Sequence, residues 1–209
     1  MISSVVYVDG FNLYYGAVKG TPYKWLDISK LCQLLLPKNQ VSKIKYFTAL
    51  VNPRPNDPEQ PLRQQIYLRA LKTIPNLEII PGHFLTHIVS MPLANCPPEN
   101  QEYAQVIKTE EKGSDVNIAS HLIYDGCKGI YDVAIVISND SDLVEAIKIV
   151  RNELNKGVIV LNPSPSKPSQ ELARYATFVK PIRQGVLAAS QFPPQMLDQI
   201  GHFYKPIAW

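Results

Sequence analysis

Residues 133–142 have the sequence VAIVISNDSD, in which an apolar run is followed at once by serine, asparagine and two aspartates. The apolar run is too short for a helix and rich in β-branched residues, which predicts a buried strand. A single aspartate would be enough to cap the helix that follows. Asp140 and Asp142 exceed that need, so we expect both in a functional site, with Ser138 orienting them by hydrogen bonds.

Two other stretches place acidic residues where an apolar strand ends. The strand pattern at residues 2–8 ends in Asp9, and Asn12 follows three residues later. Farther along, Lys112 and a glycine precede Asp115, which opens an apolar helical pattern. Each acid alone has an ordinary explanation, since Asp9 suits a turn and Asp115 is stabilised by the helix dipole. It is the recurrence of the pattern that indicates function.

Strand and helix patterns alternate up to about residue 182. This alternation predicts a doubly wound α/β fold, with a mostly parallel sheet and helices on both faces. The predicted strands are at residues 2–8, 43–51, 77–90 with a break at 81–82, 132–138, 158–161 and 178–182. Helices are predicted to begin near residues 13, 27, 57, 114, 141 and 171. Residues 83–110 predict a hairpin appended to the sheet.

One predicted helix has a clear start and a clear apolar face. Asp57 is a good N-cap, and the proline after it suits the first helical position. Leu62, Ile66 and Ala70 follow at four-residue spacing, so we expect them to form the face that packs on the core.

Composition sets the class of protein. The chain has 209 residues, 45% of them apolar, and a formal charge of +3. We expect one domain at residues 1–183 and a C-terminal appendage at 184–209. The charge permits a nucleic-acid partner without requiring one. The three cysteines lack metal-ligand spacing, and no apolar segment is long enough for a membrane span, so a cytoplasmic protein without a membrane partner is expected.

Ligands of an open α/β sheet bind beyond the carboxyl ends of its strands. We therefore expect Asp9, Asp115, Asp140 and Asp142 to converge there. Gathered carboxylates repel one another unless a cation neutralises them, and hard oxygen ligands suit Mg²⁺ or Mn²⁺. The four aspartates predict a divalent-metal site for chemistry on a phosphate ester. Zinc is disfavoured because the four histidines show no HxxxH or HExxH spacing.

At these three acidic motifs the sequence resembles the NYN domain, a branch of the PIN-like nuclease superfamily. Residues 8–12 are similar to the family's strand-Asp-Gly-x-Asn motif, residues 112–115 to its Lys-Gly-x-Asp motif, and residues 138–142 to its Ser-Gly-Asp-Ser-Asp motif. The resemblance spans roughly residues 2–182. One position departs from the pattern, because Asn139 stands where the family has glycine. Asparagine tolerates a left-handed backbone better than most residues.

The resemblance implies a Mg²⁺- or Mn²⁺-dependent enzyme that hydrolyses phosphodiester bonds, usually in RNA. The metal ligands and catalytic acids would be Asp9, Asp115, Asp140 and Asp142. Asn12 and Ser138 would support the site, and Lys112 would steady a substrate phosphate. Lys45, Arg54, Arg63 and Lys72 are further candidates for contacts with the RNA backbone.

Two other functions stay open. A nuclease-like fold with a weak or inactive site would serve as an RNA-binding or scaffold module. A haloacid-dehalogenase-like phosphatase also ends a strand in aspartate, but its chemistry needs a second aspartate two residues later, where this chain has Phe11. The sequence does not decide the oligomeric state, and a homo-oligomer is compatible with it.

Overall fold

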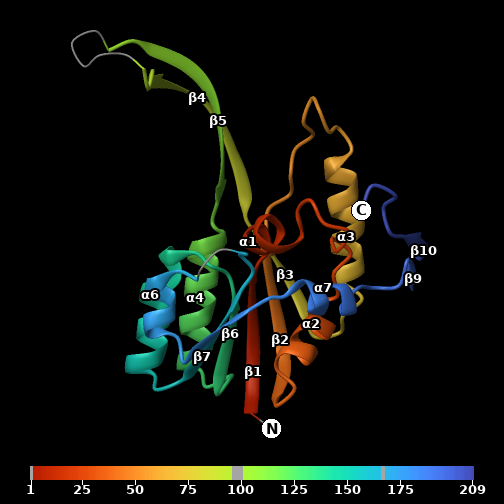
Figure 1. Ribbon diagram of the computed structural model, residues 1–209, viewed down its shortest axis with the longest axis vertical. Coiled ribbons are helices and arrows are strands. Elements are labelled where there is room, and N and C mark those ends of the chain that lie inside the picture. Colours follow the sequence, from red (N-terminus) through yellow and green to blue (C-terminus); the bar gives the residue numbers. More distant parts are fainter. Residues whose placement is uncertain (1, 96–100, 166–167) are drawn as a thin grey trace.

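Six parallel strands form the central sheet of the computed structural model, which describes residues 2–95, 101–165 and 168–209. Their order across the sheet is β3-β2-β1-β6-β7-β8, and every neighbouring pair is parallel (Figure 1). The strands are β1 (Ile2–Asp9), β2 (Asn39–Thr48), β3 (Leu77–Pro81), β6 (Val133–Ile137), β7 (Gly157–Asn162) and β8 (Phe178–Pro181). The predicted doubly wound α/β architecture is confirmed.

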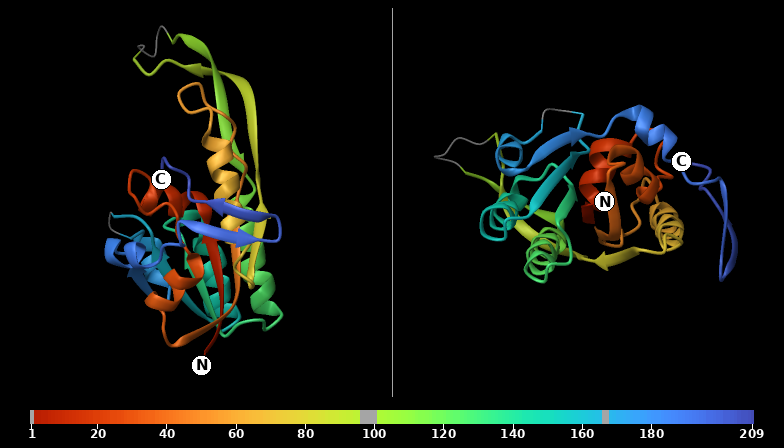
Figure 2. Two further views of the ribbon diagram at one scale, coloured as in Figure 1. Left: turned by 90° about the vertical axis from the view of Figure 1, so that its right-hand side faces the viewer. Right: turned by 90° about the horizontal axis from the view of Figure 1, so that it is seen from below.

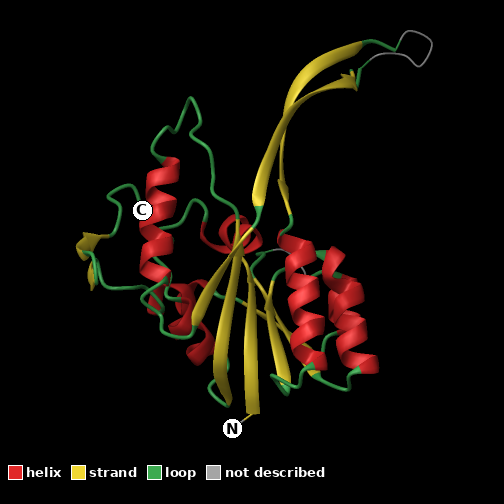
Figure 3. Ribbon diagram, turned by 180° about the vertical axis from the view of Figure 1, so that it is seen from behind, coloured by secondary structure: helices red, strands yellow, loops and turns green. Residues whose placement is uncertain are grey.

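Helices cover both faces of this sheet (Figures 2 and 3). They are α1 (Gly10–Leu13) with the π-helical turn η1 (Tyr14–Val18), α2 (Ile28–Leu35), α3 (Gln60–Leu71), α4 (Ser114–Cys127), the 3₁₀ turn η3 (Ser141–Leu143), α5 (Val144–Lys148) with the π-helical turn η4 (Ile149–Glu153), α6 (Gln170–Tyr175) and α7 (Gln184–Ala189). Among the described residues, no helix is both long and apolar enough to cross a membrane.

Alternate residues of β1 enter two separate cores. Val6 and Val8 pack with α1, α2, α3 and α7, whereas Val5 and Tyr7 pack with α4, α5 and α6. A parallel strand buried on both faces requires apolar residues at nearly every position, which is why β1 could be recognised in the sequence.

Some predicted boundaries were wrong. β2 begins at Asn39 and ends at Thr48, rather than spanning 43–51, and the first helix begins at Gly10 rather than near residue 13. The helix expected to start at Asp57 starts at Gln60.

The core face of α3 was predicted correctly in part. The carboxylate of Asp57 binds the Arg63 guanidinium, with both oxygens 2.5 Å from Nη2, so it is not used as a cap. Leu62 is 57% exposed, so its place on the core face was predicted wrongly. The predicted Ala70 is buried and the predicted Ile66 packs partly buried against the core, and Tyr67, Leu68 and Leu71 complete the face.

The predicted hairpin is confirmed. Strands β4 (His83–Pro92) and β5 (Tyr103–Lys112) pair antiparallel over their whole length and form a two-stranded sheet separate from the main one. The hairpin projects from the end of the main sheet at which β1 terminates (Figure 1). The expected loop between the strands falls partly on residues 96–100, which lie outside the described residues and include Cys96.

The C-terminal segment packs on the same core as α2. It contains α7 and a small hairpin of β9 (Gln195–Asp198) and β10 (Gly201–Tyr204). The ring of Trp25, which is fully buried, makes edge contacts with Phe192, Phe203 and Trp209 at centroid distances of 5.9, 6.4 and 6.3 Å. Its indole Nε1 donates a hydrogen bond to the Pro193 carbonyl at 2.8 Å.

A buried ion pair joins β2 to α4. Lys45 Nζ lies 2.5 Å from Asp125 Oδ2, and the two side chains are 7% and 3% exposed. The hydroxyl of Tyr7 donates to the same carboxylate oxygen at 2.7 Å, and His121 Nδ1 lies 3.0 Å from Lys45 Nζ. This pairing removes Lys45 from the candidate contacts with an RNA backbone.

Replacing Lys45 by methionine leaves the Asp125 carboxylate buried without its cation. We expect Lys45→Met to lower the free energy of unfolding by about 3–5 kcal/mol. Urea denaturation followed by circular dichroism measures the loss. The matched control is Lys43→Met, because Lys43 pairs with Glu78 at 2.6 Å on the surface, where such pairs contribute about 0–1 kcal/mol. Equal losses in the two variants would contradict this account of the buried pair.

Candidate functional site

The order of the strands reverses between β1 and β6. From β1 the chain proceeds to β2 on one side, whereas from β6 it proceeds to β7 on the other. α/β proteins bind their ligands beyond the carboxyl ends of the two strands at which the connections diverge in this way. Asp9 is the last residue of β1, and Ser138 directly follows β6.

The carboxylate of Asp9 is held by two hydrogen bonds. Its Oδ1 accepts from the backbone N–H of Asn12 at 2.9 Å, so Asp9 is the N-cap of α1. Its Oδ2 accepts from the hydroxyl of Ser138 at 3.0 Å. Because Asp9 is 5% exposed and Ser138 is fully buried, these bonds fix the orientation of the carboxylate.

Ser138 also orients the loop that carries Asp140. The backbone N–H of Asp140 donates to Ser138 Oγ at 3.0 Å, and the N–H of Asp142 donates to Asp140 Oδ1 at 3.0 Å. Asp140 is therefore the N-cap of η3, while Asp142 lies exposed in the first turn. One serine thus connects the acid that ends β1 to the acid that follows β6.

Two asparagines fasten the neighbouring loops. The N–H of Asn139 donates to Asn12 Oδ1 at 2.9 Å, and Asn139 Oδ1 accepts from the N–H of Ser169 at 2.8 Å. Among the non-glycine residues that the structure describes, positive φ occurs at Asn155 and not at Asn139. Asparagine at this position therefore needs no left-handed backbone, and its side chain links the loop after β6 to the N-cap of α6.

Asp115 reaches the site from α4. The sharp turn from β5 into this helix depends on Gly113, whose φ of 99° is left-handed. Burial is the main reason that the pKa of Asp115 is raised, and the charges of Asp140, Glu111 and Asp142 raise it further. Asp115 therefore shares one electrostatic environment with acids from two other parts of the chain.

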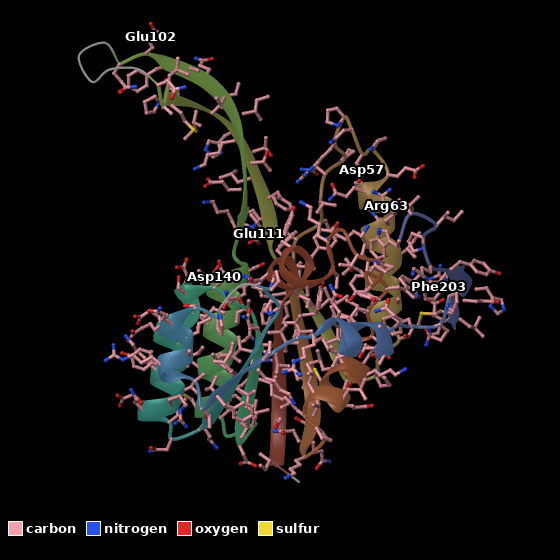
Figure 4. All side chains as sticks on the ribbon, viewed as in Figure 1. Asp57, Arg63, Glu102, Glu111, Asp140 and Phe203 are labelled. Atoms are coloured by element: carbon pink, nitrogen blue, oxygen red, sulfur yellow. The ribbon has the colours of Figure 1, made fainter. Side chains whose placement is uncertain are left out.

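Glu111 is an additional acid of this site. It lies at the base of the hairpin, at the same end of the molecule as Asp140 (Figure 4). Its Oε1 accepts a hydrogen bond from Ser114 Oγ at 2.9 Å. The sequence signal was its place just before the Lys-Gly pair, where Glu110 and Glu111 are both candidates for supporting acids. Glu110 also has an ordinary explanation as a solvated strand residue.

The carboxylates repel one another strongly enough to affect ionisation. The pKa of Asp9 is raised from 3.8 to about 6, chiefly by burial and also by the charges of Asp115 and Asp140, although the bonds from Asn12 and Ser138 act in the opposite direction. In the part of the chain that the structure describes, none of the four predicted aspartates is ion-paired with a lysine, arginine or histidine.

This donor set fits a hard divalent cation, because it consists of carboxylate oxygens whose repulsion a cation would relieve. As they stand, however, no three His, Cys, Asp or Glu side chains of the described ranges are grouped so as to hold a metal ion. The structure therefore brings Asp9, Asp115 and Asp140 within electrostatic reach of one another without showing a finished coordination sphere.

The predicted cations occupy other positions. Lys112 is exposed, and its Nζ lies 3.3 Å from Glu110 Oε2, whereas Arg63 of α3 binds Asp57, which precedes that helix. Figure 4 shows Arg63 and Asp57 at the end of α3, away from Asp140. Lys112 lies three residues before Asp115 along the chain and is paired with a strand neighbour.

Comparison with known proteins identifies the family. The family model of the NYN domain matches residues 3–182. The chain belongs to the NYN domain family. This NYN domain is also 31% identical over 234 aligned residues to a Pseudomonas putida protein named 6-hydroxy-3-succinoylpyridine 3-monooxygenase HspA, and the match covers 98% of this chain and 74% of that protein.

A solved structure shares the fold of this NYN domain. It is a crystal structure of a protein of unknown function from Vibrio parahaemolyticus, with a TM-score of 0.55 and 20% sequence identity. The match covers 88% of this chain and 94% of that one. At this level of identity the likeness shows the α/β fold alone.

The raised pKa of Asp9 predicts a stability effect with a defined sign. An acid whose pKa is higher in the fold than in the unfolded chain favours the fold at low pH. That contribution is present below about pH 4 and is lost as the pH rises through about 6. At pH 7.5 in EDTA we therefore expect Asp9→Asn to raise the free energy of unfolding by about 1–3 kcal/mol, and to change it little at pH 4.

Urea denaturation at the two pH values measures this difference. Asp132→Asn is the matched control, because Asp132 is an exposed aspartate outside the site. If Asp9→Asn loses the same stability at both pH values, the inference that the charge of Asp9 destabilises the fold is contradicted.

Proposed function

We propose that this NYN domain is a Mg²⁺- or Mn²⁺-dependent endoribonuclease that uses Asp9, Asp115, Asp140 and Asp142. The observation that carries the proposal is the buried carboxylate of Asp9, whose pKa is raised to about 6 by burial and by two further acids. Within the described residues, none of these acids has an ion pair with a cationic side chain. Buried structural acids are normally paired with a cation, so acids without one at the strand-order reversal of an α/β sheet favour a bound metal ion.

The residues of the chain prepare this site for a charged substrate. Ser138 and the N–H of Asn12 hold Asp9 in one orientation, and the cap interaction with the N–H of Asp142 holds Asp140. A bound divalent cation would supply Lewis-acid stabilisation of the charge that builds on the phosphate. Because Asp9 gains a proton as the pH falls through about 6, we expect cation affinity and activity to fall over the same range.

RNA cleavage in the presence of Mn²⁺ tests the proposal. We expect the native chain to cleave a labelled single-stranded RNA. Because Asp140→Asn removes one site charge and keeps a cap acceptor, we expect that variant to be at least about 100-fold slower, the order of effect of losing a preorganised electrostatic contact. Glu153→Gln, which neutralises an exposed acid on η4, is the control and should cleave as the native chain does.

The possible outcomes separate the open functions. Equal cleavage by the native chain and by Asp140→Asn would point to a contaminating nuclease and remove the assignment. RNA binding in EDTA without cleavage under any metal condition would favour the RNA-binding or scaffold module instead. Rapid turnover of a small aryl phosphate would favour a phosphatase.

The relative from Pseudomonas putida supports a second candidate function. A protein that is 31% identical over 98% of this chain is named as a monooxygenase of a hydroxylated pyridine. A monooxygenase puts one oxygen atom of O₂ into its substrate and reduces the other to water with two electrons from a donor. Such a reaction would also be compatible with the family, because a shared fold does not determine the chemistry.

Oxygen uptake tests the second candidate directly. If this chain has the activity that the relative is named for, 6-hydroxy-3-succinoylpyridine, O₂ and a two-electron donor should be consumed together and yield an oxygenated product. The control omits the pyridine and measures uncoupled oxidation of the donor. Consumption of the donor that does not depend on the pyridine, or no consumption, would reject the candidate.

A further inference from the structure

A cavity of about 380 Å³ lies beside the acid site, on the face of the sheet that carries α1 and α3. Its wall is formed by residues of α1, η1, the end of β2, α3 and the C-terminus. Gly10 and Phe11 line it, and they directly follow Asp9. A volume of this order accommodates a small organic molecule rather than a few waters.

The position of Gly10 brings the cavity wall against β2. A Cβ at Gly10 would lie 2.7 Å from the Phe47 carbonyl oxygen and 2.9 Å from the Tyr46 hydroxyl, so a larger residue would not fit. The Tyr46 ring is 5% exposed, and after burial the nearby charge of Asp9 contributes to raising its pKa. A molecule in the cavity would therefore lie next to the acid site.

Aromatic rings supply much of the lining. They come from different parts of the chain: Phe11, Tyr14, Tyr15, Tyr46, Tyr67 and Trp209. Several of them brace one another, since Tyr67 makes edge contacts with Tyr46 at 6.4 Å and with Trp209 at 5.7 Å. A wall of aromatic faces and edges suits a flat ring, which can stack or make edge contacts with it.

One polar atom of a lining residue lacks a hydrogen-bond partner within the described residues. It is Gln60 Oε1, which is buried. By contrast, Gln64 on the same helix accepts from the Val51 N–H at 2.9 Å and donates to the Ala49 carbonyl at 2.9 Å. A buried acceptor without a partner is costly, and a ligand with an N–H or amino donor would satisfy it.

The charged groups at the cavity differ in how they are paired. Arg63 is neutralised by Asp57, with which it makes two contacts of 2.5 Å (Figure 4). Lys24 also lines the cavity and has no carboxylate partner in the described ranges of the chain. A ligand that fits this lining carries an anionic substituent for Lys24 to contact.

We propose that this cavity binds a planar heteroaromatic ring that donates a hydrogen bond to Gln60 Oε1 and carries an anionic arm near Lys24. Two sources share this chemistry, namely the base and phosphate of a nucleotide, and a free hydroxypyridine carboxylate. The proposal stands on the cavity alone and does not depend on whether the acid site hydrolyses RNA.

Tryptophan fluorescence reports binding at this site. The chain has two tryptophans, and Trp209 lines the cavity while Trp25 contacts it at 6.3 Å. The full chain is titrated with each nucleoside monophosphate, with 6-hydroxypyridine-3-carboxylate, and with benzoate, which has no ring donor. We expect a saturable change with nucleotides or with the pyridine, and a weaker response to benzoate. The tighter of the two ligands identifies the source.

Paired variants assign the polar contacts. Gln60→Leu removes the buried acceptor and should weaken binding about tenfold. Gln65→Leu makes the same change on an exposed position of α3 and should leave affinity unchanged. Gln60→Met removes the same acceptor while keeping the length of the side chain. It should also weaken binding about tenfold, and it keeps the test available if Gln60→Leu fails to fold.

The charge contact is tested separately. We expect the native chain to bind a nucleotide more tightly than the corresponding nucleoside, which lacks the phosphate. This difference in affinity should disappear in Lys24→Met and persist in Lys30→Met, which changes an exposed lysine on α2. The absence of a saturable response to nucleotides and to the pyridine at millimolar concentration would overturn the proposal. Equal affinity of Gln60→Leu and Gln65→Leu for the ligand would overturn it as well.

Discussion

The hydrogen bond from Ser138 to Asp9 joins the ends of β1 and β6, which are 129 residues apart in the chain. It forms only because these strands are neighbours at the point where the order of the sheet reverses. The same serine accepts from the N–H of Asp140, so the position of the second acid depends on the first. Strand pairing, burial of Asp9 and the placement of the acids are therefore a single structural constraint.

Much of the fold could be predicted because its central strands are buried on both faces. Continuous apolar runs such as residues 133–137 have few alternatives to a parallel strand, and the acids at their ends then lie at one edge of the sheet. The start of α3 could not be predicted, because the carboxylate of Asp57 binds a side chain six residues later instead of capping the helix. Whether Asp57 caps the helix or binds Arg63 depends on tertiary packing, for which the local sequence has no signal.

Polar residues with a tertiary role were the hardest to interpret. Lys45 was a candidate for contact with an RNA backbone, yet it is buried in an ion pair with Asp125 of α4. Nor could the cavity have been found from the sequence, since its wall combines residues from 10 to 209 in chain order. By contrast, Asp9, Asp115 and Asp140 could be named in advance, because each stands next to a glycine or serine that ends or begins an element.

The acid site and the aromatic cavity give one fold two chemical features. Gly10 follows Asp9 and lines the cavity, so a molecule bound there would lie beside the carboxylates. A nucleotide would place a base and a phosphate in these two environments. A small heteroaromatic substrate, of the kind named for the Pseudomonas relative, would need the cavity more than the acids.

Whether the acids bind a metal ion distinguishes a nucleotide substrate from a small heteroaromatic one. A crystal grown with Mn²⁺ and measured at the manganese absorption edge tests metal binding most directly. The account predicts an anomalous peak among Asp9, Asp115 and Asp140. Ordered carboxylates with no anomalous peak between them would contradict the account.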